Sequence, residues 1–162
     1  MVAKTKITID ISDAKISADS GHELVTYSLG SCIGVCLYDP NNHIGGMLHY
    51  LLPSSGMNPE QARENPFKFC DTGMSTLLDK LVSMGVNKKR LIVKVAGGAK
   101  VLKSVDGFDI GKRNYIAIRK FLWKNGMLIN AEDVGGSIPR TLMLSIADGS
   151  VAIKSKGQKK IL

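Results

Sequence analysis

The sequence has no long hydrophobic run. No stretch among its 162 residues approaches the ~20 consecutive apolar residues of a membrane-spanning helix. The first residues, MVAKTKITIDIS, alternate polar and apolar side chains and lack the continuous apolar segment of a signal peptide. We therefore expect a cytoplasmic protein without membrane insertion.

Cysteine is scarce as well. The chain has three, Cys32, Cys36 and Cys70, and this odd number predicts free thiols in a reducing compartment rather than a disulfide framework. Cys32 and Cys36 have no second ligand pair at the spacing of a zinc site. The glycine pairs at 97–98 and 135–136 lack the spacing of a phosphate-binding loop. We therefore predict neither a metal nor another cofactor.

Acidic residues are outnumbered, since 14 Asp and Glu stand against 22 Lys and Arg, and the formal charge is +8. Half of this excess lies in the last nine residues, which contain no acid: Lys154, Lys156, Lys159 and Lys160. We accordingly divide the chain into one domain, 1–154, and a basic, solvated C-terminal tail, 155–162. Net positive charge favours acidic partners. Nucleic acid is not an expected partner, because no binding motif accompanies the charge and Trp123 falls at core spacing.

The pattern of apolar residues predicts a single α+β domain, a layered sandwich with two main helices covering a mixed sheet of seven or so strands. Helical spacing predicts one helix at about 72–84, ended by Gly85, and a second around 115–122, ended by Gly126. Residues 53–66, rich in Ser, Pro and Asn, are predicted to form a surface loop. Strands are predicted at 6–11, 24–29, 32–38, 43–52, 91–98, 127–134, 140–147 and 150–154, the consecutive strands of the first third being antiparallel.

A candidate nucleophile follows the break between two predicted strands. Cys32 comes directly after Gly30 and Ser31, and a sharp turn there leaves backbone N–H groups unpaired. The N–H groups of Ser31 and Cys32 are therefore candidates to bind an oxyanion. A cysteine has an ordinary pKa near ~8.5, so nucleophilic attack at neutral pH requires a partner that favours the thiolate, most often histidine. The alternative is that Cys32 is a small hydrophobic residue of the core.

His49 is the unusual one of three histidines, because it lies inside an apolar predicted strand, GGMLHYLLP. A titratable group in such a place is either a hydrogen-bonded structural residue or a functional one. Cys36 is interpreted as core packing. Cys70 is a second candidate nucleophile at the start of a predicted helix, but the neighbouring Asp71 opposes thiolate formation there.

Six segments, taken in their order and spacing, resemble the CheD family, the chemoreceptor glutamine deamidases of bacterial and archaeal chemotaxis. The resemblance covers roughly residues 22–154. Its most specific part is the Gly-Ser-Cys block followed by the histidine seventeen residues beyond the cysteine. The segments are SLGSCIGVCLYDP (28–40), GGMLHYLLP (45–53), CDTGMSTLLDKL (70–81), VKVAGGA (93–99), IGKRN (110–114) and AEDVGGSIPR (131–140).

The resemblance implies a layered α/β/β fold, similar to the catalytic domain of cytotoxic necrotizing factor toxins. It implies a protein-glutamine glutaminase that converts glutamine side chains of methyl-accepting chemoreceptors to glutamate through a thioester. The family's nucleophile falls on Cys32, its histidine on His49 and its third catalytic member on Thr26. The implied partners are chemoreceptor cytoplasmic domains and a CheC-type phosphatase. Two alternatives remain: a non-catalytic chemotaxis adaptor, and a receptor methyl-ester hydrolase that uses the same cysteine and histidine.

Overall fold

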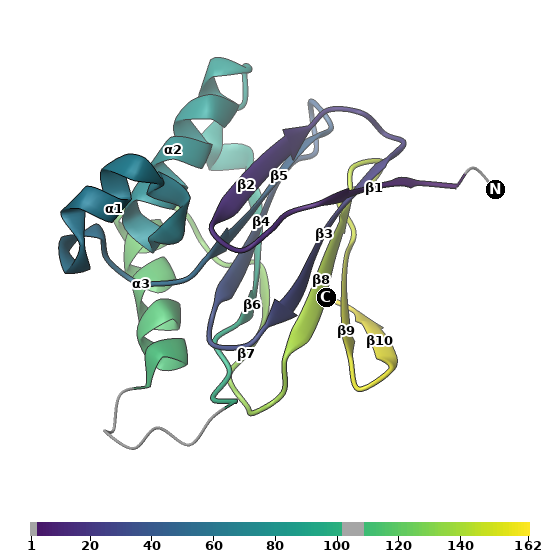
Figure 1. Ribbon diagram of the computed structural model, residues 1–162. Coiled ribbons are helices and arrows are strands. Elements are labelled where there is room, and N and C mark those ends of the chain that lie inside the picture. The colour runs from purple at the N-terminus through teal and green to yellow at the C-terminus, as the bar shows by residue number, and fades with distance from the viewer. Residues whose placement is uncertain (1–2, 102–108) are drawn as a thin grey trace.

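The structure, a computed structural model, describes residues 3–101 and 109–162, which form two five-stranded β-sheets and three α-helices (Figure 1). We call β1-β3-β8-β9-β10 the outer sheet and β2-β5-β4-β6-β7 the inner sheet. Within the described residues, no helix has the length and hydrophobicity needed to span a bilayer. The helices are α1 (Pro59–Glu64), α2 (Cys70–Ser83) and α3 (Ile110–Lys124). The strands are β1 (Thr5–Thr8), β2 (Asp13–Ser17), β3 (His22–Leu29), β4 (Ile33–Asp39), β5 (Ile44–Tyr50), β6 (Ile92–Gly97), β7 (Ala131–Val134), β8 (Arg140–Ser145), β9 (Val151–Ser155) and β10 (Gln158–Ile161).

The elements stack in three layers. Helices α2 and α3 cover one face of the inner sheet, and the outer sheet covers its other face (Figure 1). Because successive side chains of a strand point to opposite faces, the inner sheet contributes to two cores. Ile33 and Val35 of β4 pack toward the helices, whereas Cys36 packs toward the outer sheet. The predicted α+β class is confirmed. The molecule has one core between the helices and the inner sheet and a second core between the two sheets.

The strand pairing differs from the prediction in the first third of the chain. β4 and β5 are antiparallel neighbours, as predicted, but β1 pairs with β3 in parallel. β3 and β4 belong to different sheets, so they do not form the antiparallel pair expected of consecutive strands. The reason is that residues 30–32 carry the chain across the sandwich instead of folding it back on itself. The candidate cysteine therefore lies where the chain changes sheets.

Two further local predictions are wrong. Residues 53–66 are not only a loop, because they contain α1: the Asn58 side chain accepts a hydrogen bond from the Gln61 N–H, and Pro59 occupies the first turn. Trp123 is 80% exposed rather than part of the core. It lies one residue, or about 100° around the helix, beyond the buried Leu122 and so faces away from the inner sheet.

The C-terminal segment is not a frayed end. β10 pairs antiparallel with β9, and the Leu162 N–H donates to the Val151 carbonyl oxygen at 2.9 Å. All four residues of β10 are exposed, so its lysines are solvated as expected while its backbone belongs to the outer sheet. Lys159 and Lys160 are adjacent, so this segment has no alternation of apolar and polar residues that would predict a strand. The domain boundary between residues 154 and 155 stays a prediction.

Candidate functional site

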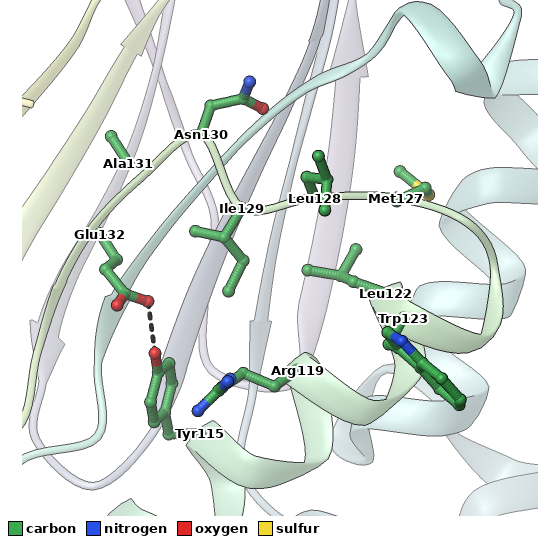
Figure 2. A pocket seen from close by; sticks show the side chains of 10 residues that line it. All are labelled: Tyr115, Arg119, Leu122, Trp123, Met127, Leu128, Ile129, Asn130, Ala131 and Glu132. Atoms are coloured by element: carbon green, nitrogen blue, oxygen red, sulfur yellow. Dashed lines mark hydrogen bonds between the residues drawn. The ribbon is translucent and has the colours of Figure 1, made fainter.

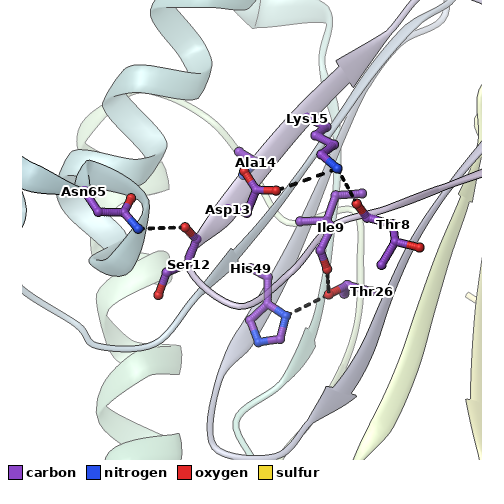
Figure 3. A network of polar contacts seen from close by, with 9 residues as sticks. All are labelled: Thr8, Ile9, Ser12, Asp13, Ala14, Lys15, Thr26, His49 and Asn65. Carbon is purple, nitrogen blue, oxygen red and sulfur yellow. Dashed lines mark hydrogen bonds and ion pairs between the residues drawn. The ribbon is translucent and has the colours of Figure 1, made fainter.

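A hydrogen bond between the two sheets joins two of the residues singled out from the sequence. Thr26 lies in β3 of the outer sheet, His49 lies in β5 of the inner sheet, and both are fully buried. The Thr26 Oγ1 and His49 Nδ1 atoms are 2.7 Å apart (Figure 3). The sandwich thus brings together a threonine and a histidine that are 23 positions apart in the chain.

The Thr26 hydroxyl decides which nitrogen of His49 carries the proton. It donates its hydrogen to the Ile9 carbonyl oxygen at 2.7 Å (Figure 3). A hydroxyl has a single hydrogen, so in its contact with His49 the threonine oxygen accepts and the Nδ1–H donates. Nε2 is then the unprotonated nitrogen of the neutral ring. It has no hydrogen-bond partner within residues 3–101 and 109–162, so the site holds a free, buried base nitrogen.

Burial keeps this imidazole neutral. The segment 9–12, which joins β1 to β2, passes beside the ring (Figure 3), and the Ser12 N–H donates to the His49 carbonyl oxygen at 2.8 Å. Removal from water lowers the pKa of His49 from 6.5 to about 4, and the charge of Asp10 opposes this shift only in part. At neutral pH His49 is therefore an uncharged base.

Cys32 lies on the same face of the inner sheet as His49. In the β4–β5 ladder Gly34 is the partner of His49, and Cys32 is two residues before Gly34. Cys32 directly precedes β4, and its side chain packs in the core between the sheets, which is the side on which His49 meets Thr26. Cys32 is 7% exposed and borders the core between the sheets. The structure thus places all three predicted residues in one layer of the sandwich.

The thiol of Cys32 is protonated at rest. Burial raises the pKa of Cys32 above 9.0, and its own backbone N–H lowers it by a smaller amount. Because the pKa of His49 is lowered as well, the resting site holds a neutral thiol and a neutral imidazole rather than an ion pair. Removal of the thiol proton has to accompany attack on a substrate.

The turn that carries Cys32 has all three of its carbonyl groups engaged. The Gly30 carbonyl accepts from the Ala99 N–H at 2.8 Å, and the Cys32 carbonyl accepts from the Gly98 N–H at 2.9 Å. The Ser31 carbonyl accepts from the Asn114 side chain, also at 2.9 Å. The N–H groups of Ser31 and Cys32, in contrast, donate to no other residue in the described parts of the chain. These two donors are therefore available to an oxyanion.

Asn114 is the residue that the sequence analysis did not single out. It lies in α3, is fully buried, and donates from Nδ2 to the carbonyl oxygens of Ser31 and Leu51, both at 2.9 Å. Ser31 precedes the cysteine, and Leu51 follows the histidine by two residues, so one amide ties the two segments together. The two acceptors fix its orientation, because only an NH₂ group donates twice. The motif IGKRN contains Asn114, and this was the available signal.

The other two cysteines lie outside this arrangement. Cys36 is 1% exposed in the core between the sheets, and burial raises its pKa, in line with the core-packing interpretation. Cys70 is the first residue of α2, and burial raises its pKa to about 12. Asp71 raises the pKa of Cys70 further, while a hydrogen bond with Tyr50 lowers it. Among the described residues, no group of three or more His, Cys, Asp or Glu is placed to hold a metal ion.

A groove of about 550 Å³ lies on another part of the surface, between the C-terminal half of α3 and the segment that leads into β7 (Figure 2). Trp123 and Leu128 stand out from it, each 80% exposed. At its other end the Tyr115 hydroxyl donates to a Glu132 carboxylate oxygen at 2.6 Å (Figure 2). Its lining contains no cysteine or histidine, so it offers none of the chemistry found around Cys32.

Comparisons with known proteins show which family the chain belongs to. The family model described as "CheD chemotactic sensory transduction" matches residues 51–155. A protein of Solibacter usitatus named "Probable chemoreceptor glutamine deamidase CheD" is 45% identical over 97% of this chain and 93% of its own length. A protein of Syntrophus aciditrophicus named "Probable chemoreceptor glutamine deamidase CheD 1" is 46% identical over 93% of this chain and 94% of its own length. An archaeal one, of Methanococcus maripaludis, is 37% identical over the full length of both chains. Likeness of this extent places the chain in the CheD family.

Proposed function

We propose that the protein is a chemoreceptor glutamine deamidase, which hydrolyses the carboxamide of selected glutamine side chains to a carboxylate. Membership of the CheD family supports the activity and the receptor substrate. The observation that carries the chemistry is the hydrogen bond from His49 to Thr26, which leaves Nε2 as a free base on the same face as Cys32. A thiol, a base and two unpaired N–H donors are the groups that acyl transfer requires.

In the first half of the reaction, the Cys32 sulfur attacks the carboxamide carbon of the substrate as His49 Nε2 takes the thiol proton. The N–H groups of Ser31 and Cys32 hold the oxygen of the tetrahedral intermediate. The carbon–nitrogen bond then breaks, and the proton on Nε2 passes to the departing nitrogen, which leaves as ammonia. The acyl group stays on the sulfur as a thioester.

In the second half, water attacks the thioester carbon and gives a proton to His49 Nε2. The carbon–sulfur bond breaks, and the proton returns to the sulfur of Cys32. The substrate side chain is now a glutamic acid, which ionises in solution. The neutral resting state suits this cycle, because His49 begins and ends it as the unprotonated base that its low pKa favours.

Two residues position the reacting groups. Thr26 holds the imidazole in the tautomer with Nε2 free, which is the role of the carboxylate or amide in other triads. Because its hydroxyl is neutral, it stabilises an imidazolium less than an aspartate would. Asn114 fixes the turn that carries Cys32 against the end of β5, which carries His49. Both residues act through others and touch no reacting atom.

The family resemblance adds further proposals. A CheC-type phosphatase is a proposed second partner, the cytoplasm is the proposed location, and the catalytic domain of cytotoxic necrotizing factor toxins is the proposed relative in fold. None of these enters the chemistry above. The steps depend only on groups present in this chain.

The test is to incubate the protein with the cytoplasmic fragment of a chemoreceptor from the same organism and map glutamine-to-glutamate conversion by peptide mass spectrometry. Conversion should be lost in Cys32→Ala and kept in Cys36→Ala, a matched change of a buried cysteine outside the site. Ammonia should be released in proportion. Release of methanol from methylated receptor would indicate the ester hydrolase instead, and receptor binding without conversion by the wild type would indicate the adaptor.

A further inference from the structure

The outer sheet has one face that no helix of the described structure covers. The helices lie on the far side of the inner sheet, and the opposite face of the outer sheet is open (Figure 1). Three residues whose side chains lie on this side of the sheet, Val25, Met143 and Ala152, form a small apolar cluster that neighbouring side chains largely cover, since they are 1%, 8% and 8% exposed. A groove of about 440 Å³ runs over this face, with Val25 and Met143 in its lining and the turn between β9 and β10 at its side.

The groove is positively charged. Lys6, Lys154 and Lys156 line it and are exposed, and no Asp or Glu is among its lining residues. Arg140 also lines it, but its guanidinium is paired with Asp133 at 3.0 Å. Glu23, the one acid of β3, is the cross-strand partner of Lys6. The three lysines have no ion-pair partner among the described residues, and the exposed Tyr27 stands beside them, so the groove favours a ligand that is both acidic and partly apolar.

The groove reaches the end of β3, which runs into the turn that carries Cys32. Tyr27 and Ser28 line it, and they stand in the chain between Thr26 and the turn that carries Cys32. The pairing of β3 with β8 shifts here, and Ser28 has a φ of 57°, so the strand bulges at this point. The Gly30 N–H donates to the Ser28 carbonyl oxygen at 2.9 Å. The groove on the outer face therefore ends at residues that run directly into the cysteine turn, while Cys32 itself borders the core between the sheets.

We infer that this groove docks an acidic helix of the substrate protein beside the glutamine that is converted. The inference rests on the proposed function and names the contact that selects the substrate. Side chains three and four residues apart share one face of a helix. Carboxylates at these spacings from a glutamine can reach the groove lysines while the glutamine enters the turn at Cys32. Aliphatic side chains on the same face meet Tyr27, which is 47% exposed.

The experiment compares two double variants with the same change of net charge. Lys154→Glu with Lys156→Glu alters the groove, and Lys88→Glu with Lys89→Glu alters two exposed lysines on the turn before β6. We expect the groove variant to bind the receptor cytoplasmic fragment about tenfold more weakly and the control to change by less than about twofold. The groove variant should raise KM and leave kcat unchanged. Thermal unfolding confirms that both variants fold.

Equal weakening in the two variants would show non-specific attraction by net charge and overturn the inference, as would unchanged binding in both. A duplex DNA probe affected by the groove variant while the receptor fragment is not would overturn it too. The proposed function fails separately. If the wild type converts no glutamine, but the groove variant still binds the receptor fragment more weakly than the control variant does, the docking groove is supported and the deamidase chemistry is refuted.

Discussion

Replacing Thr26 with valine tests how the site selects one tautomer of His49. Valine keeps the shape of threonine but removes the hydroxyl, so the His49 Nδ1–H and the Ile9 carbonyl both lose their 2.7 Å partner. A buried group left without its hydrogen bond costs about 1–3 kcal/mol. That energy no longer favours the Nδ1–H tautomer, so the ratio of this tautomer to the Nε2–H tautomer falls by about 5- to 150-fold. We expect kcat for deamidation to fall by up to this factor, with KM unchanged.

The assay is steady-state ammonia release with a receptor fragment, run beside Thr26→Ser as the matched control. Serine keeps the hydroxyl, so it should recover most of the lost kcat. Thr26→Val and Thr26→Ala should both retain more activity than Cys32→Ala, which removes the nucleophile itself. A Thr26→Val variant as active as the wild type, or a Thr26→Ser variant as slow as Thr26→Val, would refute the tautomer argument.

Three more predictions follow from the buried groups. The pKa of His49, lowered to about 4, puts the acid limb of kcat/KM near pH 4 rather than 6.5. Because the unfolded chain binds a proton at this histidine more readily, the free energy of unfolding should fall by about 3 kcal/mol as the pH drops from 6.5 to 4. Urea titrations should show a smaller fall in His49→Asn. Burial raises the pKa of Cys32, so iodoacetamide should label it slowly at pH 7 and faster above pH 9; stoichiometric labelling at pH 6 would contradict this. Asn114→Leu leaves the carbonyl groups of Ser31 and Leu51 without a donor, which should cost about 1–3 kcal/mol of stability for each and lower both kcat and the melting temperature. An unchanged kcat would show that Asn114 does not position the reacting groups.

The parts of the fold that follow a clear period were predictable from the sequence. α2 ends next to Gly85, whose φ of 92° is the left-handed conformation that favours glycine, and α3 ends before Gly126, whose φ is 67°. β4 and β5 carry strong apolar signals and pair as predicted. β10 was missed because its lysines are all exposed and give no apolar alternation. α1 was missed because a short helix depends on its cap at Asn58 more than on periodicity.

The candidate site shows the same division. Cys32 and His49 could be singled out because a cysteine after Gly-Ser and a histidine in an apolar strand are unusual in a sequence. Thr26 came only from the family resemblance, since its contact with His49 joins two sheets and has no local signature. The raised pKa of Cys32 could not be predicted from the sequence, because burial is a property of the fold. The role of Asn114 could not be predicted, because its hydrogen bond to the Ser31 carbonyl depends on how α3 packs against the cysteine turn.

The most direct test of the central claim is to look for the thioester on Cys32. A reaction of the protein with a receptor fragment is quenched in acid during turnover, digested, and analysed by mass spectrometry. The account predicts a Cys32 peptide joined to the substrate glutamine peptide with loss of ammonia, and neither adduct nor glutamate with Cys32→Ala. Undiminished conversion of glutamine by Cys32→Ala, with no adduct on Cys32 in the wild type, would contradict it.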